Sequence, residues 1–126
     1  MSDPFFDTNI VVDWLKRQPE AITELGRYSR HRLSRIVWTE VLAVEDLDRR
    51  DVVRQALSHF EIAELDARIA SAASDIRFRS QMKLMDAFIL ATAQVNGAIL
   101  VTRNTQDFPA NLPGIRIPYT LEQRPV

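Results

Sequence analysis

The chain has 126 residues, of which 46% are hydrophobic and 26% are charged. These values predict a soluble globular protein with one domain over residues 1–126. The absence of cysteine excludes disulfide frameworks, thiolate zinc sites and cysteine nucleophiles. A net charge of -1 argues against a protein that coats nucleic acid through a general positive field. Since no leader segment or membrane-spanning run is evident, we expect a cytoplasmic protein.

Short apolar strands alternate with helices along the chain. The predicted strands cover residues 5–6, 35–38, 61–65, 98–101 and 115–117. The predicted helices cover residues 9–16, 19–28, 40–44, 47–59, 67–78 and 84–95. This alternation predicts an α/β fold of three layers, in which a central parallel sheet of four to five strands lies between helices.

Local signals support several of these boundaries. Thr39 and Asp66 are suitable N-caps for the helices that follow them, and Asn96-Gly97 suits a left-handed helix end. Hydrophobic periodicity places Val52 and Phe78 on the apolar faces of their helices.

Polar and acidic residues come directly after the predicted strands. Asp7 follows the first strand, Glu40 follows the second, and Asn104 and Asp107 follow the strand that ends at Val101. Strands of a parallel sheet present their carboxyl ends at one edge, where ligands bind in α/β proteins. We therefore expect these side chains to lie at one edge of the sheet.

Asp86 adds a further acid at the start of the helix over residues 84–95, and such helix starts usually lie at the same edge. It is a charge among apolar neighbours, and charges of this kind are rarely buried without a partner. Taken singly, Asp7 is equally well explained as a helix cap and Glu40 as a partner of the helix dipole. The joint pattern of acids favours a metal site.

Gathered carboxylates repel one another, and a hard divalent cation removes that cost. His31 and His59 are the only histidines, so the oxygen-rich ligand set favours Mg²⁺ or Mn²⁺ over Zn²⁺. Such ions support hydrolysis at phosphorus by activating water and offsetting charge. The acids therefore predict metal-dependent cleavage of a phosphodiester.

Four motifs occur in a characteristic order. They are Phe6-Asp7-Thr8-Asn9, Trp38-Thr39-Glu40-Val41-Leu42, Lys83 to Ala93 and Leu100 to Phe108. As a set they resemble the PIN-domain ribonucleases, and most closely the VapC toxins of bacterial toxin–antitoxin pairs, over the whole chain. The resemblance implies a PIN-like α/β/α fold, Mg²⁺ or Mn²⁺ as the cofactor, and endonucleolytic cleavage of RNA, often tRNA or another structured RNA. It also implies a VapB-like antitoxin as partner and a homodimer within the complex.

The resemblance also assigns roles to residues. The acids that match the family's catalytic metal ligands are Asp7, Glu40, Asp86 and Asp107. Asn104 stands where some relatives have Asp, so either Asn104 or Asp107 is the fourth site residue, and we favour Asp107 with Asn104 as a neutral helper. The residues expected to orient carboxylates or water are Thr8, Asn9 and Thr102.

Two cations next to the motif acids have open roles. Lys83 and Arg103 are placed to hold RNA phosphates, although Arg103 could equally brace a carboxylate.

Met85 departs from the Pro that relatives commonly have there, which affects only the start of the helix. The arginines between Arg27 and Arg35 are expected to form a solvated, ion-paired turn, with a phosphate-binding rim as the alternative. Trp14 is expected in the core, or else in a groove for an antitoxin helix.

Two other functions compete with the nuclease. A signalling receiver domain shares the size, the layers and the acid cluster, but it needs paired acids after the first strand and a Lys after the fifth, which this sequence lacks. A PIN-like scaffold without activity would keep the fold and act only as a binding module, and the full set of acids argues against it.

Overall fold

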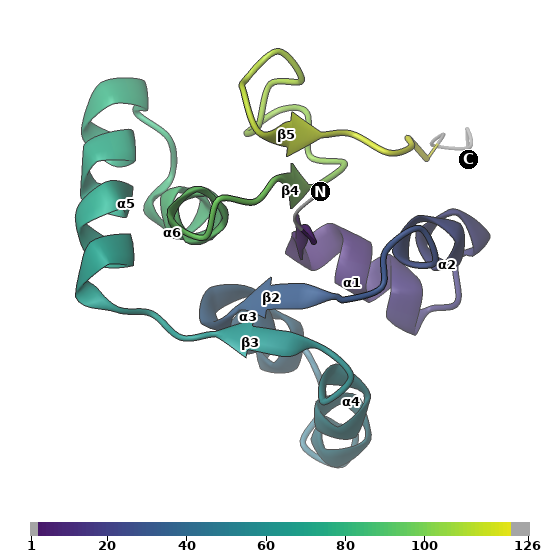
Figure 1. Ribbon diagram of the computed structural model, residues 1–126. Coiled ribbons are helices and arrows are strands. Elements are labelled where there is room, and N and C mark those ends of the chain that lie inside the picture. The colour runs from purple at the N-terminus through teal and green to yellow at the C-terminus, as the bar shows by residue number, and fades with distance from the viewer. Residues whose placement is uncertain (1–2, 122–126) are drawn as a thin grey trace, which may run out of the picture.

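The computed structural model describes residues 3–121 and has a five-stranded parallel sheet at its centre (Figure 1). The strands are β1 (Phe5–Phe6), β2 (Arg32–Ser34), β3 (Glu61–Ala63), β4 (Leu100–Val101) and β5 (Ile115–Arg116). Their order in the sheet is β3-β2-β1-β4-β5, and every neighbouring pair is parallel. The prediction of a parallel α/β sheet is therefore confirmed.

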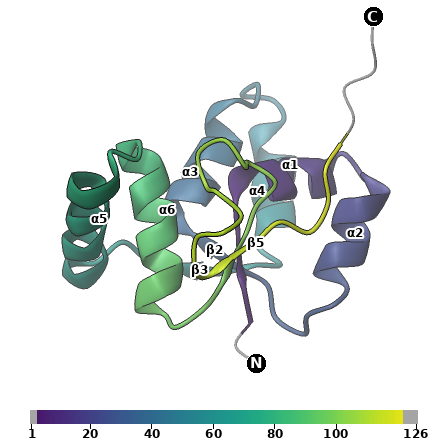
Figure 2. The same ribbon diagram turned by 90° about the horizontal axis from the view of Figure 1, so that it is seen from above.

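Helices flank the sheet, with α5 and α6 on one side and α1 and α2 on the other in both views (Figures 1 and 2). The helices are α1 (Thr8–Leu15), α2 (Pro19–Leu25), α3 (Arg35–Ala43), α4 (Arg50–Leu57), α5 (Ala67–Ser80) and α6 (Leu84–Val95). Within residues 3–121, none of these helices has the length and hydrophobicity needed to cross a bilayer.

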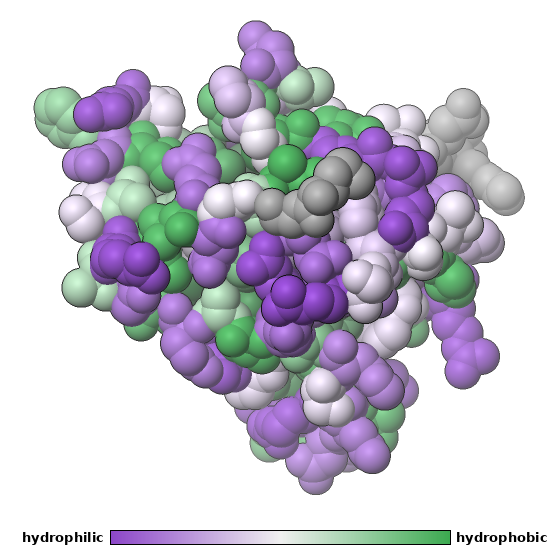
Figure 3. Space-filling view, viewed as in Figure 1, coloured by the Kyte–Doolittle hydropathy of each residue, from purple (hydrophilic) through white to green (hydrophobic). Residues whose placement is uncertain are grey.

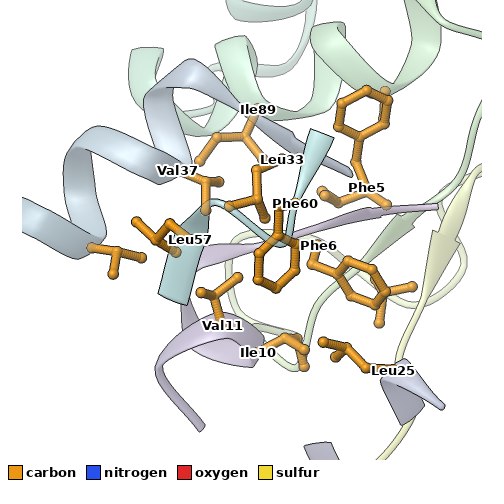
Figure 4. Packing of buried hydrophobic residues seen from close by; sticks show 14 of the residues in the cluster. Phe5, Phe6, Ile10, Val11, Leu25, Leu33, Val37, Leu57, Phe60 and Ile89 are labelled. Carbon is orange, nitrogen blue, oxygen red and sulfur yellow. The ribbon is translucent and has the colours of Figure 1, made fainter. Parts of the chain in front are cut away.

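The middle strand β1 pairs along one edge with β2 and along the other with β4. Phe5 and Phe6 are both buried, as expected for a central parallel strand. The ring of Phe6 meets the ring of Phe60 edge to face, with 6.4 Å between their centroids. Ile10 and Val11 of α1 pack into the same core (Figure 4), which fixes the start of α1 against the end of β1.

A second apolar cluster joins α5 to α6. Ile69 and Ala73 of α5 pack with Ala87 and Ala91 of α6. Small alanine side chains let two helices approach closely, so α6 is held at a defined height beside the sheet. This packing sets the position of Asp86 in the first turn of α6.

The second strand differs from the prediction. The sequence predicts a strand over residues 35–38 because Ile36, Val37 and Trp38 have high β-propensity. The structure instead has its strand three residues earlier, and α3 begins at Arg35. Burial decides the outcome: Val37 and Val41, one helical turn apart, both face the core.

The N-cap of α3 also differs from the prediction. Ser34, not Thr39, is the cap, and its hydroxyl accepts a 3.0 Å hydrogen bond from the amide of Val37. Thr39 lies inside the helix, where its hydroxyl donates to the carbonyl of Arg35. Glu40 therefore lies in the second turn of α3, and the prediction that it complements the helix dipole in the first turn is wrong.

Two residues predicted on apolar faces are exposed. Val52 is 65% exposed and Phe78 is 83% exposed. Each lies on its helix opposite the residues that are buried, which are Val53 and Leu57 in α4 and Ile69 and Ala73 in α5. Trp14 is half-buried and packs edge to face against Phe60 at 5.2 Å.

The new boundary of α3 leads to a direct test. Replacing Ser34 by Ala removes the buried cap and should lower the free energy of unfolding by about 1 kcal/mol. Thr39→Ala is the matched control, because it removes an exposed hydroxyl inside a helix and should leave stability nearly unchanged. Chemical denaturation of both variants measures the difference, and a larger loss for Thr39→Ala would contradict the observed helix start.

Candidate active site

Asp7 is the centre of the candidate site. It follows β1, caps α1 and is only 4% exposed. One carboxylate oxygen, Oδ1, accepts a 2.8 Å hydrogen bond from the amide of Thr8. The other, Oδ2, accepts hydrogen bonds from the hydroxyl of Thr102 at 2.7 Å and from Nδ2 of Asn9 at 3.3 Å. The orientation of this carboxylate is therefore set by three neighbours.

The charge on Asp7 is nevertheless costly. Burial raises the pKa of the Asp7 carboxyl, and the nearby charge of Glu40 raises it further. The hydrogen bonds from Thr102, Thr8 and Asn9 act in the opposite direction, but the net shift is upward. The carboxylate is thus held in place without a positive charge that would balance it.

Glu40 reaches the same place from α3. The hydroxyl of Thr8 donates a 2.6 Å hydrogen bond to Oε1 of Glu40. Because the amide of Thr8 also donates to Asp7, one residue connects two acids that are far apart in the sequence. The structure therefore brings Asp7, Thr8 and Glu40 together, although Glu40 does not directly follow a strand.

Asp86 shows the clearest effect of the cluster. Its pKa is raised from the ordinary value of 3.8 to about 6, first by burial and then by the charges of Asp107, Asp7 and Glu40. Lys83 opposes this shift only weakly, as the smallest of the contributions. The acids thus lie close enough for their charges to oppose that of Asp86, and a bound cation relieves this kind of repulsion.

Asp107 and Asn104 form a small turn at the edge of this cluster. Nδ2 of Asn104 donates to Oδ2 of Asp107 at 2.9 Å, and Oδ1 of Asn104 accepts from the amide of Asp107 at 3.1 Å. The amide of Asn104 donates to the hydroxyl of Thr102. Nζ of the exposed Lys83 lies 3.8 Å from Oδ2 of Asp107. Asp107 therefore carries the charge of this turn, and Asn104 fixes the position of Asp107 through these two hydrogen bonds.

The donor atoms fit a hard divalent cation. They are all oxygens, and the raised pKa values of Asp7 and Asp86 indicate a deficit of positive charge. Among residues 3–121, no group of three or more acidic or histidine side chains is arranged so that it could hold a metal ion by itself. Mg²⁺ keeps several waters and usually takes one or two carboxylates from the protein, so its binding here would need water ligands beside the acids.

The structure also shows two residues that the sequence analysis missed. Asp13 of α1 is 5% exposed and forms a two-pronged ion pair with Arg103, at 2.6 Å and 2.9 Å. The hydroxyl of Tyr119 donates to the same carboxylate at 2.8 Å. Burial alone would raise the pKa of Asp13, but these partners outweigh it and the pKa is lowered. Of the two roles open to Arg103, its side chain braces a carboxylate, although one outside the predicted set.

A signal for Asp13 was present in the sequence. It is the only charge in the apolar run from Ile10 to Leu15, which is the same pattern that marked Asp86. No such signal exists for Tyr119, because it follows β5 and contacts a residue more than a hundred positions away.

Three arginines between Arg27 and Arg35 are engaged in ion pairs. Arg30 donates to Glu61 at 2.8 Å, and Arg35 donates to Glu64 at 2.9 Å. Arg27 lies 3.8 Å from Glu24. This agrees with the ion-paired turn expected from the sequence.

The fold and the site define a class of protein: an α/β domain that gathers acids at the carboxyl edge of a parallel sheet. The model of the PIN domain family matches residues 5–110, and the chain belongs to that family. The predicted resemblance is thus confirmed. PIN domains are nucleases, so the chain has the fold of a nuclease family. A search of curated proteins found no match.

Solved structures agree with the family. A toxin–antitoxin complex from Klebsiella pneumoniae is 37% identical, with a TM-score of 0.87 over 94% of this chain and 100% of that chain. The DNA-bound VapBC from Salmonella typhimurium is 29% identical, with a TM-score of 0.76 over 92% of this chain and 96% of that chain. FitAcB from Neisseria gonorrhoeae is 23% identical and shows the same fold, with a TM-score of 0.75 over 93% of this chain and 99% of that chain.

Repulsion at Asp86 predicts a pH-dependent stability. In metal-free protein, folded Asp86 binds a proton up to about pH 6, whereas the unfolded chain releases it near 3.8. The wild type therefore loses stability as the pH rises through this window. Asp86→Asn lacks the titrating carboxyl. Above pH 6 its free energy of unfolding should therefore exceed that of the wild type by on the order of 1 kcal/mol, after allowance for solvent screening. Below pH 4 the two proteins should be equally stable.

Thermal unfolding in EDTA between pH 4 and 8 measures this difference. Asp75→Asn, on the exposed face of α5, controls for the loss of one negative charge. If Asp86→Asn were less stable than the wild type at pH 8, burial and the neighbouring acids would not oppose the charge of Asp86 as described.

Proposed function

We propose that this protein is a divalent-metal-dependent endoribonuclease and the toxin of a toxin–antitoxin pair. The observation that carries the proposal is that four acids from separate segments meet at one edge of the sheet. Thr8 donates to both Asp7 and Glu40, and burial together with the charges of Asp107, Asp7 and Glu40 raises the pKa of Asp86. Membership of a nuclease family and 37% identity to a chain of a toxin–antitoxin complex support it.

Asp7, Asp86 and Asp107 would hold Mg²⁺ or Mn²⁺, and Glu40 would do so directly or through a water. When bound, the ion supplies activation of water and stabilisation of negative charge on the phosphate. Asp107 is our choice for the fourth acid because Asn104 is occupied with holding it.

The neighbours of the acids have supporting roles. Thr102 and Asn9 orient Oδ2 of Asp7. Thr8 orients both acids, because its amide donates to Asp7 and its hydroxyl donates to Glu40. Lys83 is exposed next to Asp107, where its ammonium group can contact an RNA phosphate. The substrate we propose is tRNA or another structured RNA, cleaved in the cytoplasm.

A groove on the other side of α1 suits an antitoxin helix. Its volume is about 1050 Å³, and it is lined by apolar residues of α1, α2 and α4, among them Trp14, Leu15, Ile22, Val52 and Ala56. The charged side chains of Arg17, Glu45 and Arg49 also line it. A groove lined by both apolar and charged side chains suits an amphipathic helix, so we propose that a VapB-like antitoxin binds here.

Exposed apolar residues at the α5–α6 end of the molecule support a homodimer. Phe78, Leu84 and Met85 are all exposed, and hydrophobic residues lie among hydrophilic ones over these helices in the space-filling view (Figure 3). Burial of such side chains against a second copy would remove them from water.

The metal-dependent reaction predicts the effect of removing one acid. Asp7→Asn should reduce RNA cleavage by about 100-fold or more, since it weakens the cation that stabilises the transition state. EDTA should abolish cleavage by the wild type, and Mg²⁺ or Mn²⁺ should restore it. Asp75→Asn is the control.

Other outcomes would point to the alternatives. Cleavage by Asp7→Asn at the wild-type rate without metal would refute the mechanism. Calorimetric titration of antitoxin-free protein with Mn²⁺ identifies an inert PIN scaffold if no binding is seen.

The groove predicts a partner-specific variant. Val52→Glu places a charge in the apolar groove and should weaken binding of a VapB-like antitoxin by at least about 10-fold. Because Val52 is exposed, nuclease activity should remain. Leu47→Glu is the matched control, since Leu47 is 79% exposed but does not line the groove. Equal binding by both variants, measured by calorimetry, would place the antitoxin elsewhere.

A further inference from the structure

A chain of hydrogen bonds runs from Tyr119 to the central carboxylate of the site. Tyr119 donates to Asp13, and Arg103 donates to Asp13 through both Nε and Nη2. The backbone amide of Arg103 in turn donates to Oδ1 of Asn9 at 3.2 Å. Through its Nδ2, Asn9 donates to Oδ2 of Asp7.

We propose that Asp13, Arg103 and Tyr119 are positioning residues, which hold Asn9 and the segment after β4 so that the carboxylate of Asp7 keeps one orientation. The inference rests on the proposed nuclease function for its consequence, but the hydrogen-bonded chain can be tested without it.

The contact between the Arg103 backbone and Asn9 fixes which atom of the Asn9 side-chain amide faces Asp7. An amide side chain can present either its oxygen or its nitrogen to a neighbour. Because the oxygen of Asn9 accepts from the Arg103 backbone, its nitrogen is left to donate to Asp7 and to Thr102. Thr102 then donates its own proton to Asp7. Movement of the Arg103 backbone would release Asn9 and loosen both contacts to Asp7.

The geometry of the ion pair suits this task. A guanidinium group that binds a carboxylate through two parallel bonds is fixed in direction as well as in distance. Asp13 is anchored on α1 within the same helix as Asn9, so α1 holds Arg103 at two points, once by its side chain and once by its backbone. Tyr119 adds a third contact from the segment after β5.

The same three groups occur a second time in the molecule. Glu24 is 4% exposed and accepts from Arg116 at 2.8 Å and 3.0 Å, and the hydroxyl of Tyr28 donates to it at 2.9 Å. The side-chain hydrogen bonds of this second triad stay among its three members. Its link to the site is the backbone carbonyl of Arg116, which accepts from the amide of Thr102 at 3.0 Å beside the β4–β5 pairing, and side-chain substitutions leave that backbone bond in place. The second triad is therefore a built-in control for the stability that a buried acid, Arg and Tyr provide.

A competing role for Arg103 makes opposite predictions. If Arg103 bound RNA phosphates, its loss would raise KM and weaken the salt dependence of binding. Loss of Asp13 would then free the guanidinium and lower KM. A positioning role instead predicts that changes at Asp13 and Arg103 act on Asp7 alike, and that their effects are not additive.

The experiment compares Asp13→Asn, Arg103→Lys and Tyr119→Phe with the control variants Glu24→Gln, Arg116→Lys and Tyr28→Phe. Three quantities are measured on the full chain: Mn²⁺ affinity by calorimetry, kcat and KM for RNA cleavage, and the side-chain amide signals of Asn9 by NMR. The thermal midpoint of each variant reports its stability.

We expect Asp13→Asn and Arg103→Lys to lower Mn²⁺ affinity or kcat by about 10- to 100-fold with KM within about two-fold, as partners of metal ligands do. Tyr119→Phe should have a smaller effect. All three should shift the Asn9 signals. The control variants should lower the thermal midpoint to a similar degree and leave Mn²⁺ affinity, kcat and the Asn9 signals unchanged.

Two results would overturn the proposal. One is a loss of stability in Asp13→Asn and Arg103→Lys with unchanged Asn9 signals and Mn²⁺ affinity, which would show a structural role only. The other is a raised KM in Arg103→Lys with a lowered KM in Asp13→Asn, which would show contact with RNA. If the wild type neither binds Mn²⁺ nor cleaves RNA, the proposed function fails, and the Asn9 signals still decide whether the chain of contacts exists.

Discussion

The candidate site depends on repulsion between carboxylates that the fold brings together. Asp7 is buried at the end of the central strand, and Asp86 has a pKa of about 6 because burial and three other acids oppose its charge. Without a cation, this arrangement costs stability. The neutral donors Thr8, Asn9 and Thr102 orient the acids but do not supply the missing positive charge. The cluster therefore lacks the positive charge that the proposed cation would supply.

The rest of the fold maintains this unfavourable cluster. The strands β1 and β4 have two residues each, so ladder hydrogen bonds alone could not hold the edge of the sheet in place. Burial of Phe5 and Phe6 in the core fixes the end of β1, and the alanine-rich contact between α5 and α6 fixes the start of α6. Side-chain bonds between α1 and the segment after β4 then complete the site.

Helix α1 connects the two surfaces on which function is proposed. Its residues Asn9 and Asp13 face the acid cluster and Arg103, whereas Val12, Trp14 and Leu15 line the apolar groove. An eight-residue helix thus borders both the site that would cut RNA and the groove that would receive the antitoxin. Contacts on both sides agree with its sequence, in which one buried charge, Asp13, lies among the apolar residues from Ile10 to Leu15.

Local patterns in the sequence were enough to predict the alternating elements, the parallel sheet and the bounds of α6, because caps, turns and helical periodicity act over a few residues. The family motifs likewise named the acids that the structure brings together. The tertiary structure decided what local patterns could not. Residues 35–38 form a helix because burial of Val37 and Val41 outweighs their β-propensity. The partners of Arg103 come from positions 90 residues before it and from the segment after β5, and only folding determines which distant groups meet.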